Sequence, residues 1–307
     1  MNSFKTDMLV GYTGFVGSNI DSKHEFTYRI NSRNKEEAWG MNPDLLVYAG
    51  LRAEKFLANN DPEKDMETIE EAFSQIEKIN PKKLVLISTV DVYKSPVDVD
   101  ENTEIDTENL AAYGLNRYRL EQMVRERFED ALIIRLPGLF GKNIKKNFIY
   151  DYIHVIPSML KADKYNELSE RSSMVRDAYT NLQNGFYKCM DTSEELKAEF
   201  KRLGFSALNF TDSRGVFQFY NLGNLWKDIN IALDNDIRLL NIATEPVSVA
   251  EIYEALTEGE GFDNQVAANP PYYNYRSVHA GLFGGKDGYF IGKQQILQEI
   301  IDFVNSN

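Results

Sequence analysis

The chain has 307 residues, of which 43% are hydrophobic and 26% are charged, and its formal net charge is −13. This composition is that of an ordinary globular protein. The acidic balance argues against nucleic acid as a partner, because binding a phosphate backbone requires a basic face. Length alone allows one large domain or two fused ones.

The cysteine and histidine residues further limit the class of protein that this sequence can encode. Cys189 is the single cysteine, so an intramolecular disulfide is excluded, which fits a reducing cytosol. The three histidines are far apart in sequence, and no motif predicts a metal site. No apolar run approaches the roughly 18 residues of a membrane span, and the polar N-terminus gives no sign of a signal peptide. We therefore expect a cytoplasmic protein with no metal and no membrane contact.

The first predicted element is a short apolar strand, Met8–Val10. Gly11, Gly14 and Gly17 follow it, and a helix is expected from about Ser18. Glycines at such a turn let the backbone bend sharply and approach a bulky ligand, while the helix start favours an anion. The loop therefore predicts binding of a dinucleotide pyrophosphate, although its G-x-x-G-x-x-G spacing differs from the better-known G-x-G-x-x-G.

The second predicted strand, Phe26–Ile30, bears on the choice of cofactor. An acidic residue after this strand binds the ribose hydroxyls of NAD, whereas an arginine suits the additional phosphate of NADP. Here the strand is followed by Asn31-Ser32-Arg33-Asn34, which contains no acid. Arg33 therefore favours NADP, with NAD as the alternative; an arginine on a solvated turn would give the same pattern.

The next elements continue an alternation of strands and helices. Three further strands are nearly all apolar, as in a buried parallel sheet, at Asp44–Tyr48, Lys83–Ser88 and Ala131–Arg135. Helical periodicity is found over Asp61–Ile79 and Leu110–Phe128. This order predicts an α/β fold with a Rossmann-type, doubly wound parallel sheet.

The regular alternation is lost after Pro137. Residues from about 143 to 214 are expected to be mostly helical and polar. Later strands are expected at Val216–Tyr220 and Arg238–Ile242, and later helices at Asn224–Leu233, Ser248–Leu256 and Lys293–Val304. We predict a NAD(P)-binding domain over residues 1–142 and a smaller α/β substrate-binding part over 143–307, with residues of about 216–242 returning to the Rossmann sheet.

Tyr113 and Arg117 are four residues apart in the helix Leu110–Phe128, which places them on one face. A tyrosine with an ordinary pKa of about 10 is a poor acid or base at neutral pH, and a nearby cation moves that pKa toward the working range. Ser88 and Thr89 end the fourth strand, where such sheets place their ligands. A surface Tyr–Arg pair beside a polar loop would show the same spacing.

Taken in order, these segments resemble the extended (atypical) short-chain dehydrogenase/reductase family, the nucleotide-sugar epimerases, dehydratases and reductases. Ser88–Tyr93 is similar to the family's S-[ST]-x-x-V-Y segment, and Arg135–Gly141 to the stretch leading into its substrate site. The resemblance implies that Thr89 supplies the catalytic hydroxyl and that Tyr113 is the catalytic tyrosine. Arg117 stands where the family has a lysine that holds the nicotinamide ribose and lowers the tyrosine pKa.

The resemblance also implies the remaining site residues. The expected cofactor contacts are the glycine loop, the arginine after the second strand, the small residues after the third strand and the basic residue of the catalytic helix: Gly11, Thr13, Gly14, Phe15, Val16, Gly17, Arg33, Ala49, Gly50 and Arg117. The expected substrate contacts are Asp91, Asn147 and Phe148, of which the last two are similar to an N-F pair of sugar-nucleotide reductases.

The expected function is therefore an NAD(P)-dependent oxidoreductase or epimerase acting on a nucleotide-linked sugar by hydride transfer, with Tyr113 exchanging the proton. A homodimer through Asp61–Ile79 and Leu110–Phe128 is implied. Arg117 leaves open a non-catalytic NAD(P)-binding sensor or scaffold. Asp91 leaves open a sugar-nucleotide 4,6-dehydratase, because those enzymes carry a glutamate base at this position.

Overall fold

The computed structural model describes residues 4–307, which form two compact units. Unit 1 contains the described residues up to Ile144, together with Phe217–Val247 and Tyr272–Glu299. Unit 2 contains Lys145–Val216, Ser248–Pro271 and Ile300–Asn307. The segment 272–299, which the sequence placed with the substrate-binding part, thus belongs to unit 1.

Unit 1 is built on a six-stranded sheet with the strand order β12-β5-β4-β3-β1-β2. Every neighbouring pair is parallel, which confirms the predicted Rossmann-type α/β fold. Most of its strands are buried on both faces, which explains their near-continuous apolar sequences. The strands are β1 (Asp7–Val10), β2 (Tyr28–Ile30), β3 (Leu45–Tyr48), β4 (Lys83–Thr89), β5 (Leu132–Leu136) and β12 (Leu239–Asn241).

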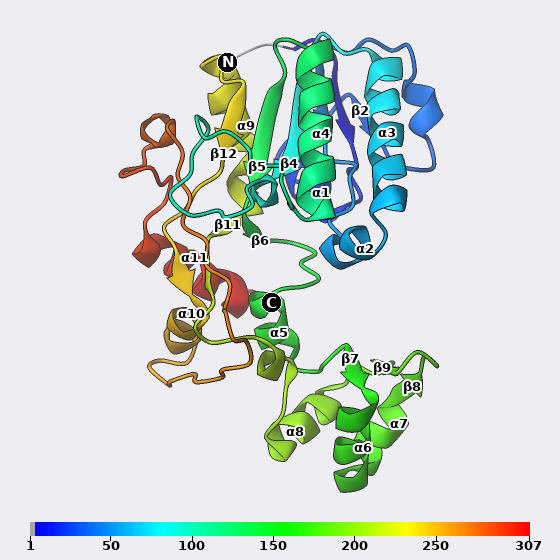
Figure 1. The fold of residues 1–307 in the computed structure, drawn as a ribbon, viewed down its shortest axis with the longest axis vertical. Helices are drawn as coiled ribbons and strands as arrows, with labels where there is room; N and C mark the ends of the chain where they lie inside the picture. The colour runs from blue at the N-terminus through cyan, green and yellow to red at the C-terminus, as the bar shows by residue number, and fades with distance from the viewer. Residues whose placement is uncertain (1–3) are drawn as a thin grey trace. The chain divides into compact units, whose positions relative to one another are not determined.

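Helices cover both faces of this sheet. On one face α3 (Pro62–Ile79) and α4 (Ala112–Arg127) lie side by side, as Figure 1 shows. They pack on alternate strand residues such as Met8, whereas α1 (Phe15–Asp21) and α9 (Leu225–Asp234) pack on the other set. The alternation follows from the two-residue period of a strand, which sends successive side chains to opposite faces.

The sequence explains the bounds of α3. The Asp61 side chain accepts a hydrogen bond from the backbone N–H of Lys64, and proline occupies the first helical turn. Its four buried residues, Ile69, Ala72, Ile76 and Ile79, are spaced by three or four and face the sheet. The helix ends at Asn80, which adopts the left-handed conformation.

Shorter elements complete unit 1. A two-stranded parallel sheet pairs β6 (Gly138–Phe140) with β11 (Phe219–Asn221). The remaining short elements are helical: α2 (Lys55–Asn60), η1 (Lys35–Ala38), η2 (Val90–Val92), η4 (Leu222–Asn224) and η5 (Ala280–Phe283). The chain passes between the units at β10 (Val216–Phe217), at β13 (Val247–Ser248) and within α11 (Lys293–Asn305).

Two predicted strands differ from the structure. The predicted strand Val216–Tyr220 is two strands, because buried Gln218 breaks it by donating to the backbone carbonyls of Thr244 (2.6 Å) and Tyr275 (2.9 Å). The predicted strand Phe26–Ile30 begins only at Tyr28. Thr27, just before it, donates both its N–H and its hydroxyl to the Asp7 carboxylate, at 2.8 Å each.

Unit 2 has its own core and a small sheet that the sequence did not predict. An antiparallel sheet has the order β7-β9-β8, and its core includes Leu168, Val175 and Phe200. Its elements are α5 (Phe148–His154), β7 (Met159–Lys161), α6 (Ala162–Arg171), α7 (Ser173–Ala178), β8 (Tyr179–Asn181), β9 (Phe186–Cys189), α8 (Glu194–Leu203), η3 (Ala207–Phe210) and α10 (Val249–Leu256). Across residues 4–307, no helix combines the length and the apolar character needed to span a bilayer.

Candidate active site

The glycine loop joins β1 to α1 by close backbone contacts. Gly11 has a φ of +89°, and a Cβ there would lie 2.4 Å from the carbonyl oxygen of Ala49. A Cβ on Gly17 would lie 2.1 Å from the carbonyl oxygen of Gly11. Gly14 is exposed and precedes the first turn of α1, which no side chain caps. A side chain is therefore excluded at Gly11 and Gly17, because the protein's own backbone lies there. The exposed Gly14 leaves the start of α1 open to a ligand.

The loop lies where the strand order of the sheet reverses. The strands β2 and β3 flank β1 on opposite sides, so the connections after β1 and β3 diverge at the carboxyl edge. α/β sheets generally bind their ligands at such a point. Ala49 donates its N–H to the carbonyl of Val10 at 2.9 Å, which brings Ala49 and Gly50 next to Gly11. These three predicted cofactor residues therefore meet at the position where α/β sheets of this type bind their ligands.

The other predicted cofactor residues of the loop, Thr13, Phe15 and Val16, differ in the exposure of their side chains. Thr13 is exposed, whereas Phe15 and Val16 pack their side chains against the core beneath α1. The side chains of Phe15 and Val16 are half-buried, and their contact with a cofactor stays a prediction.

Arg33 lies on a turn after β2 whose shape is fixed by asparagines. Asn34 accepts the N–H of Asn31 at 2.8 Å and donates to the carbonyl of Arg29 at 3.1 Å. Asn31 accepts the N–H of Arg33 at 2.8 Å and donates to the hydroxyl of Tyr12, in the glycine loop, at 3.2 Å. The exposed Arg33 is thus carried on an ordered turn that is bonded to the glycine loop.

Thr89 and Tyr113 are brought together at the carboxyl end of β4. Thr89 is the last residue of β4, and its hydroxyl accepts the N–H of Asp91 at 3.2 Å. Tyr113 is in the first turn of α4 and only 7% exposed, and a side-chain interaction with Thr89 lowers the pKa of Tyr113. A Cβ on Gly114 would lie 2.0 Å from the carbonyl oxygen of Asp91, so α4 contacts η2 backbone to backbone. No motif in the sequence marks Gly114 for this contact.

Arg117 stacks on Tyr113 but is bound to other groups. Its guanidinium carbon is 4.0 Å from the centroid of the Tyr113 ring. Its Nη1 donates to Asp65 on α3 at 2.6 Å, and its Nη2 donates to the carbonyl of Arg52 at 3.0 Å. The side chains of Arg117 and Asp65 are 5% and 10% exposed. The positive charge of Arg117 is therefore buried and directly neutralised.

Asp91 is held by two residues that the sequence did not single out. Its Oδ1 accepts hydrogen bonds from Nζ of Lys55, on α2, at 2.9 Å and from the hydroxyl of Tyr273 at 3.0 Å. The sequence carried no signal for this cluster, because its members come from three distant segments.

Burial decides the pKa of Tyr113. Burial raises it above its ordinary value, the Arg117 charge lowers it, the Asp91 carboxylate raises it and the Lys55 charge lowers it. The net pKa is raised. Arg117 therefore lowers this pKa, in the direction expected, but burial outweighs it, so the pKa of Tyr113 stays above its ordinary value.

A buried polar network fixes the end of β4. Ser88 donates to Glu121 at 2.6 Å, Arg135 on β5 donates to the same carboxylate at 2.6 Å, and Arg135 also donates to the hydroxyl of Tyr93 at 2.8 Å. Glu121 and Arg135 are 0% and 1% exposed. The network ties β4, α4, β5 and the residue after η2 into one rigid support for Thr89.

The two remaining predicted substrate residues belong to unit 2, where each has a structural role. The Asn147 side chain accepts the N–H groups of Ile149 (3.0 Å) and Tyr150 (3.2 Å) and so caps α5. Phe148 is buried, with its ring 5.9 Å from that of Phe262. Their contact with substrate stays a prediction.

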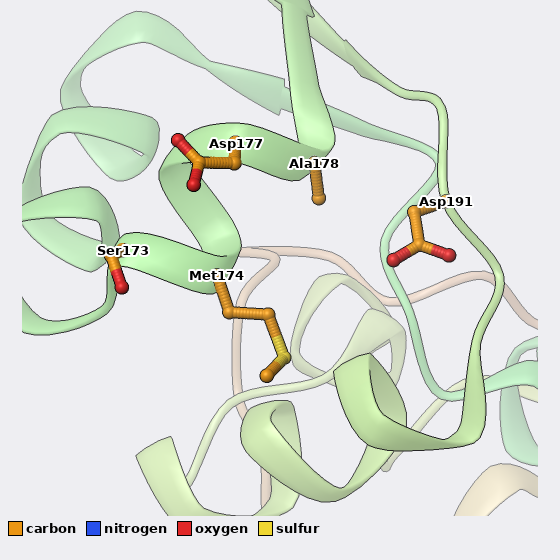
Figure 2. Close-up of a pocket in the computed structure, with 5 residues that line it drawn as sticks. All are labelled: Ser173, Met174, Asp177, Ala178 and Asp191. Atoms are coloured by element: carbon orange, nitrogen blue, oxygen red, sulfur yellow. The ribbon is translucent and has the colours of Figure 1, made fainter.

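Unit 2 also has an open hollow, shown in Figure 2, lined by Ser173, Met174, Asp177, Ala178 and Asp191. It contains none of the predicted site residues. Within the part of the chain that the structure describes, no group of three or more His, Cys, Asp or Glu residues is placed to hold a metal ion.

The parallel sheet, with a glycine loop after β1, defines a Rossmann-type fold. No protein-family model and no curated protein matches the sequence. Solved structures of the extended short-chain dehydrogenase/reductase type do match the fold.

Three of these structures are representative. The dTDP-4-dehydrorhamnose reductase of Bacillus anthracis, in complex with NADP, matches with a TM-score of 0.62 at 15% identity, covering 100% of both chains. The enzyme of that name from Clostridium acetobutylicum gives 0.63 at 12% identity, covering 98% of this chain and 99% of the other. The UDP-glucose 4-epimerase of Thermotoga maritima, with UDP-glucose, gives 0.60 at 13% identity, with coverage of 98% and 99%. The chain therefore shares their fold over nearly its whole length.

Proposed function

We propose that this chain is an NAD(P)-dependent oxidoreductase or epimerase of the extended short-chain dehydrogenase/reductase family, acting on a nucleotide-linked sugar. The observation that carries the proposal is the pairing of Thr89 with Tyr113 at the carboxyl end of β4, in the same unit and at the same sheet edge as the glycine loop. The fold shared with an NADP-bound reductase and a UDP-glucose epimerase supports it.

NADP is the proposed cofactor, and the residues present fit it. Gly11 and Gly17 pack against the protein's own backbone and so shape the turn, and the exposed Gly14 precedes the uncapped first turn of α1, which suits a pyrophosphate. Arg33, exposed on its ordered turn, suits the 2′-phosphate, and Ala49 and Gly50 allow a close approach beside it. When bound, the cofactor would supply or accept the hydride.

The protein's own part in the reaction is proton transfer and orientation. Tyr113 donates a proton to the sugar oxygen in reduction and accepts it in oxidation, while the Thr89 hydroxyl holds that oxygen. Burial keeps Tyr113 protonated near neutral pH, which suits a proton donor. We retain Asp91, Asn147 and Phe148 as the proposed substrate contacts.

A 4,6-dehydratase is the weaker alternative within the same fold. Its base would be Asp91, whose Oδ1 accepts hydrogen bonds from both Lys55 and Tyr273. A carboxylate that is already bonded to a cation and a hydroxyl is poorly placed to remove a carbon-bound proton. The two reactions differ in cofactor use, since a reductase consumes NADPH and a dehydratase recycles it.

A non-catalytic NAD(P)-binding sensor or scaffold is the second alternative, and the Arg117–Asp65 pair favours it. Substitution of Tyr113 by phenylalanine distinguishes the enzyme from the non-catalytic binding protein. Nucleotide sugars are first screened for thermal stabilisation in the presence of NADPH, and turnover is then measured on those that bind.

We expect Tyr113→Phe to lower kcat/KM by at least about 100-fold, because general acid–base catalysis contributes on that scale, with NADPH affinity unchanged. Tyr118→Phe, on the same helix, is the matched control. Equal turnover by wild type and Tyr113→Phe would refute the acid/base assignment. NADPH binding without turnover of any stabilising nucleotide sugar would favour the sensor.

A homodimer through α3 and α4 remains part of the proposal. Among the described residues, the exposed large apolar side chains lie outside these two helices, so such an interface would be polar. Sedimentation equilibrium tests it, and a monomer at micromolar concentration would refute it.

A further inference from the structure

Arg117 stands where the resembled family has a ribose-binding lysine, but its guanidinium binds oxygens of the protein itself. Its Nη1 donates to the Asp65 carboxylate at 2.6 Å and to the carbonyl of Tyr113 at 3.3 Å. Its Nη2 donates to the carbonyl of Arg52 at 3.0 Å. The Arg117 side chain is 5% exposed. Arg117 thus joins three parts of unit 1, which are α3, α4 and the segment that follows β3.

Asp65, in the first turn of α3, is held by two neighbouring side chains of α4. Its Oδ2, which binds Arg117, also accepts the side-chain amide of Asn116 at 2.9 Å. The same amide donates to the carbonyl of Pro62 at 3.1 Å. The Asp65 side chain is 10% exposed, and Asn116 is 2% exposed. The carboxylate is therefore fixed from both sides, and it gives the guanidinium one position and orientation.

The segment of residues 49–54 runs from β3 to α2 beside the glycine loop. Its first two residues contact Gly11. At its far end Asn59, on α2, accepts the backbone N–H of Tyr113 at 2.9 Å, which docks α2 on the first turn of α4. Between these two attachments, Nη2 of Arg117 holds the segment to α4 by its carbonyl at residue 52. A change at Arg117 is therefore transmitted to backbone that lies against the proposed cofactor turn.

We infer that Arg117 and Asp65 form a clamp that positions residues 49–54 beside the glycine loop, and that Arg117 does not bind the nicotinamide ribose. The inference rests on the proposed function. It deepens that function by making cofactor binding depend on Asp65, a residue of α3 that lies outside every motif of the sequence.

The shape of the guanidinium group explains why arginine suits this clamp. It is planar and carries donors on both terminal nitrogens, so Arg117 binds a carboxylate with one and a backbone carbonyl with the other. A lysine ammonium is a single point of charge on a flexible stem. We expect Arg117→Lys to keep the ion pair with Asp65 and to lose the bond to the carbonyl of Arg52.

The first measurement is amide hydrogen exchange in the cofactor-free protein, read by mass spectrometry on peptides that cover residues 49–60. We expect Asp65→Asn, Arg117→Met and Arg117→Lys to exchange at least about fivefold faster there, the effect of losing one hydrogen bond. The matched controls are Glu67→Gln on α3 and Arg127→Met on α4, both exposed, and they should exchange as wild type does. Wild-type exchange in any of the three clamp variants would overturn the inference.

The second measurement separates positioning from direct contact by comparing two ligands in isothermal titration calorimetry. NADPH contains the nicotinamide ribose, whereas 2′,5′-ADP lacks it and keeps the adenosine half. A displaced segment 49–54 disturbs the glycine loop, so Asp65→Asn and Arg117→Met should raise the Kd of both ligands by about fivefold or more, the lower end of a typical coupling between separate groups. Glu67→Gln should leave both values unchanged.

Direct contact predicts a different pattern of affinities. If Arg117 bound the ribose, Arg117→Met would raise the Kd of NADPH alone, and Asp65→Asn would leave both Kd values as in wild type. Either result would overturn the inference.

A single clamp variant that fails to fold, because a buried charge has lost its partner, is replaced in both measurements by the apolar pair Arg117→Met with Asp65→Leu. This double variant should show the same fast exchange and weakened binding, and wild-type values in it would contradict the clamp. If wild type binds no NADPH, the proposed cofactor fails, and the exchange measurement still decides whether the clamp holds the segment. NADPH binding without turnover of any nucleotide sugar would refute the proposed enzyme, whereas the inference would still be decided by the two Kd values.

Discussion

The two units hold their predicted functional residues in different ways. In unit 1 these residues are fixed by contacts between distant segments, such as Gly11 against Ala49 and Asp91 against Tyr273. In unit 2 the Asn147 side chain caps the helix that follows it, and the Phe148 ring is buried beside that of Phe262. A residue fixed from several sides can be preorganised for chemistry, whereas a capping residue is explained by the fold alone. This contrast indicates that the candidate site residues of unit 1 are preorganised.

The largest effect on stability should come from breaking the buried ion pair between Glu121 and Arg135, which supports β4. Glu121→Gln leaves the Arg135 guanidinium buried without its carboxylate, so we expect a loss of about 3–5 kcal/mol in the free energy of unfolding. Urea denaturation measures it. Glu126→Gln, on the exposed side of the same helix, is the control and should be neutral. A loss below about 1 kcal/mol would mean that the network is not a rigid support.

An intermediate effect is expected at the contact between α4 and η2. A Cβ at position 114 would lie 2.0 Å from the Asp91 carbonyl, so Gly114→Ala must displace η2. We expect a loss of about 1–3 kcal/mol from this overpacking, together with lower kcat, even though alanine favours helices. Gly281→Ala adds a Cβ where nothing lies within 4 Å and serves as the control. Unchanged stability and turnover would show that η2 can move away from α4 at little energetic cost.

The smallest effect on stability is expected from a substitution of Asn147 in unit 2. Asn147 has a φ of +100°, so glycine is the substitution that keeps the backbone. Replacing a capping side chain by glycine should reduce stability by only a few tenths of a kcal/mol. If Asn147 only caps α5, KM for the nucleotide sugar stays the same in Asn147→Gly. A severalfold rise in KM at unchanged stability would instead assign it to the substrate site and weaken the contrast between the units.

Local patterns explain which parts of the fold were predictable. The apolar runs of β3, β4 and β5 and the spacing of Ile69, Ile76 and Ile79 in α3 depend only on neighbouring residues, and the structure has these elements within one or two residues. The helix predicted over Ser248–Leu256 also depends on local signals, and the structure has it, with a capping box formed by Ser248 and Glu251. The three-stranded sheet of unit 2 was missed because its strands have three or four residues each and little alternation.

The site was predictable only where a motif lies within one segment. Spacing and resemblance singled out Thr89 and Tyr113, which interact in the structure; their catalytic role stays a prediction. Lys55 and Tyr273 were not found, because neither has a sequence neighbour that marks it and their meeting at Asp91 is a property of the folded chain. The burial that raises the pKa of Tyr113 is likewise a tertiary effect, which spacing does not contain.

The hydrogen bond from Tyr273 to Asp91 joins residues that are 182 positions apart. Chains emerge from the ribosome N-terminus first, and domains fold as they appear. Thr89 and Tyr113 are therefore synthesised long before Tyr273, which holds Asp91 in place. Strand β12 likewise joins β5 only after unit 2 has begun to emerge. A nascent chain stopped before residue 272 would therefore carry both residues of the acid/base pair but lack one anchor of Asp91, so synthesis itself delays completion of the site.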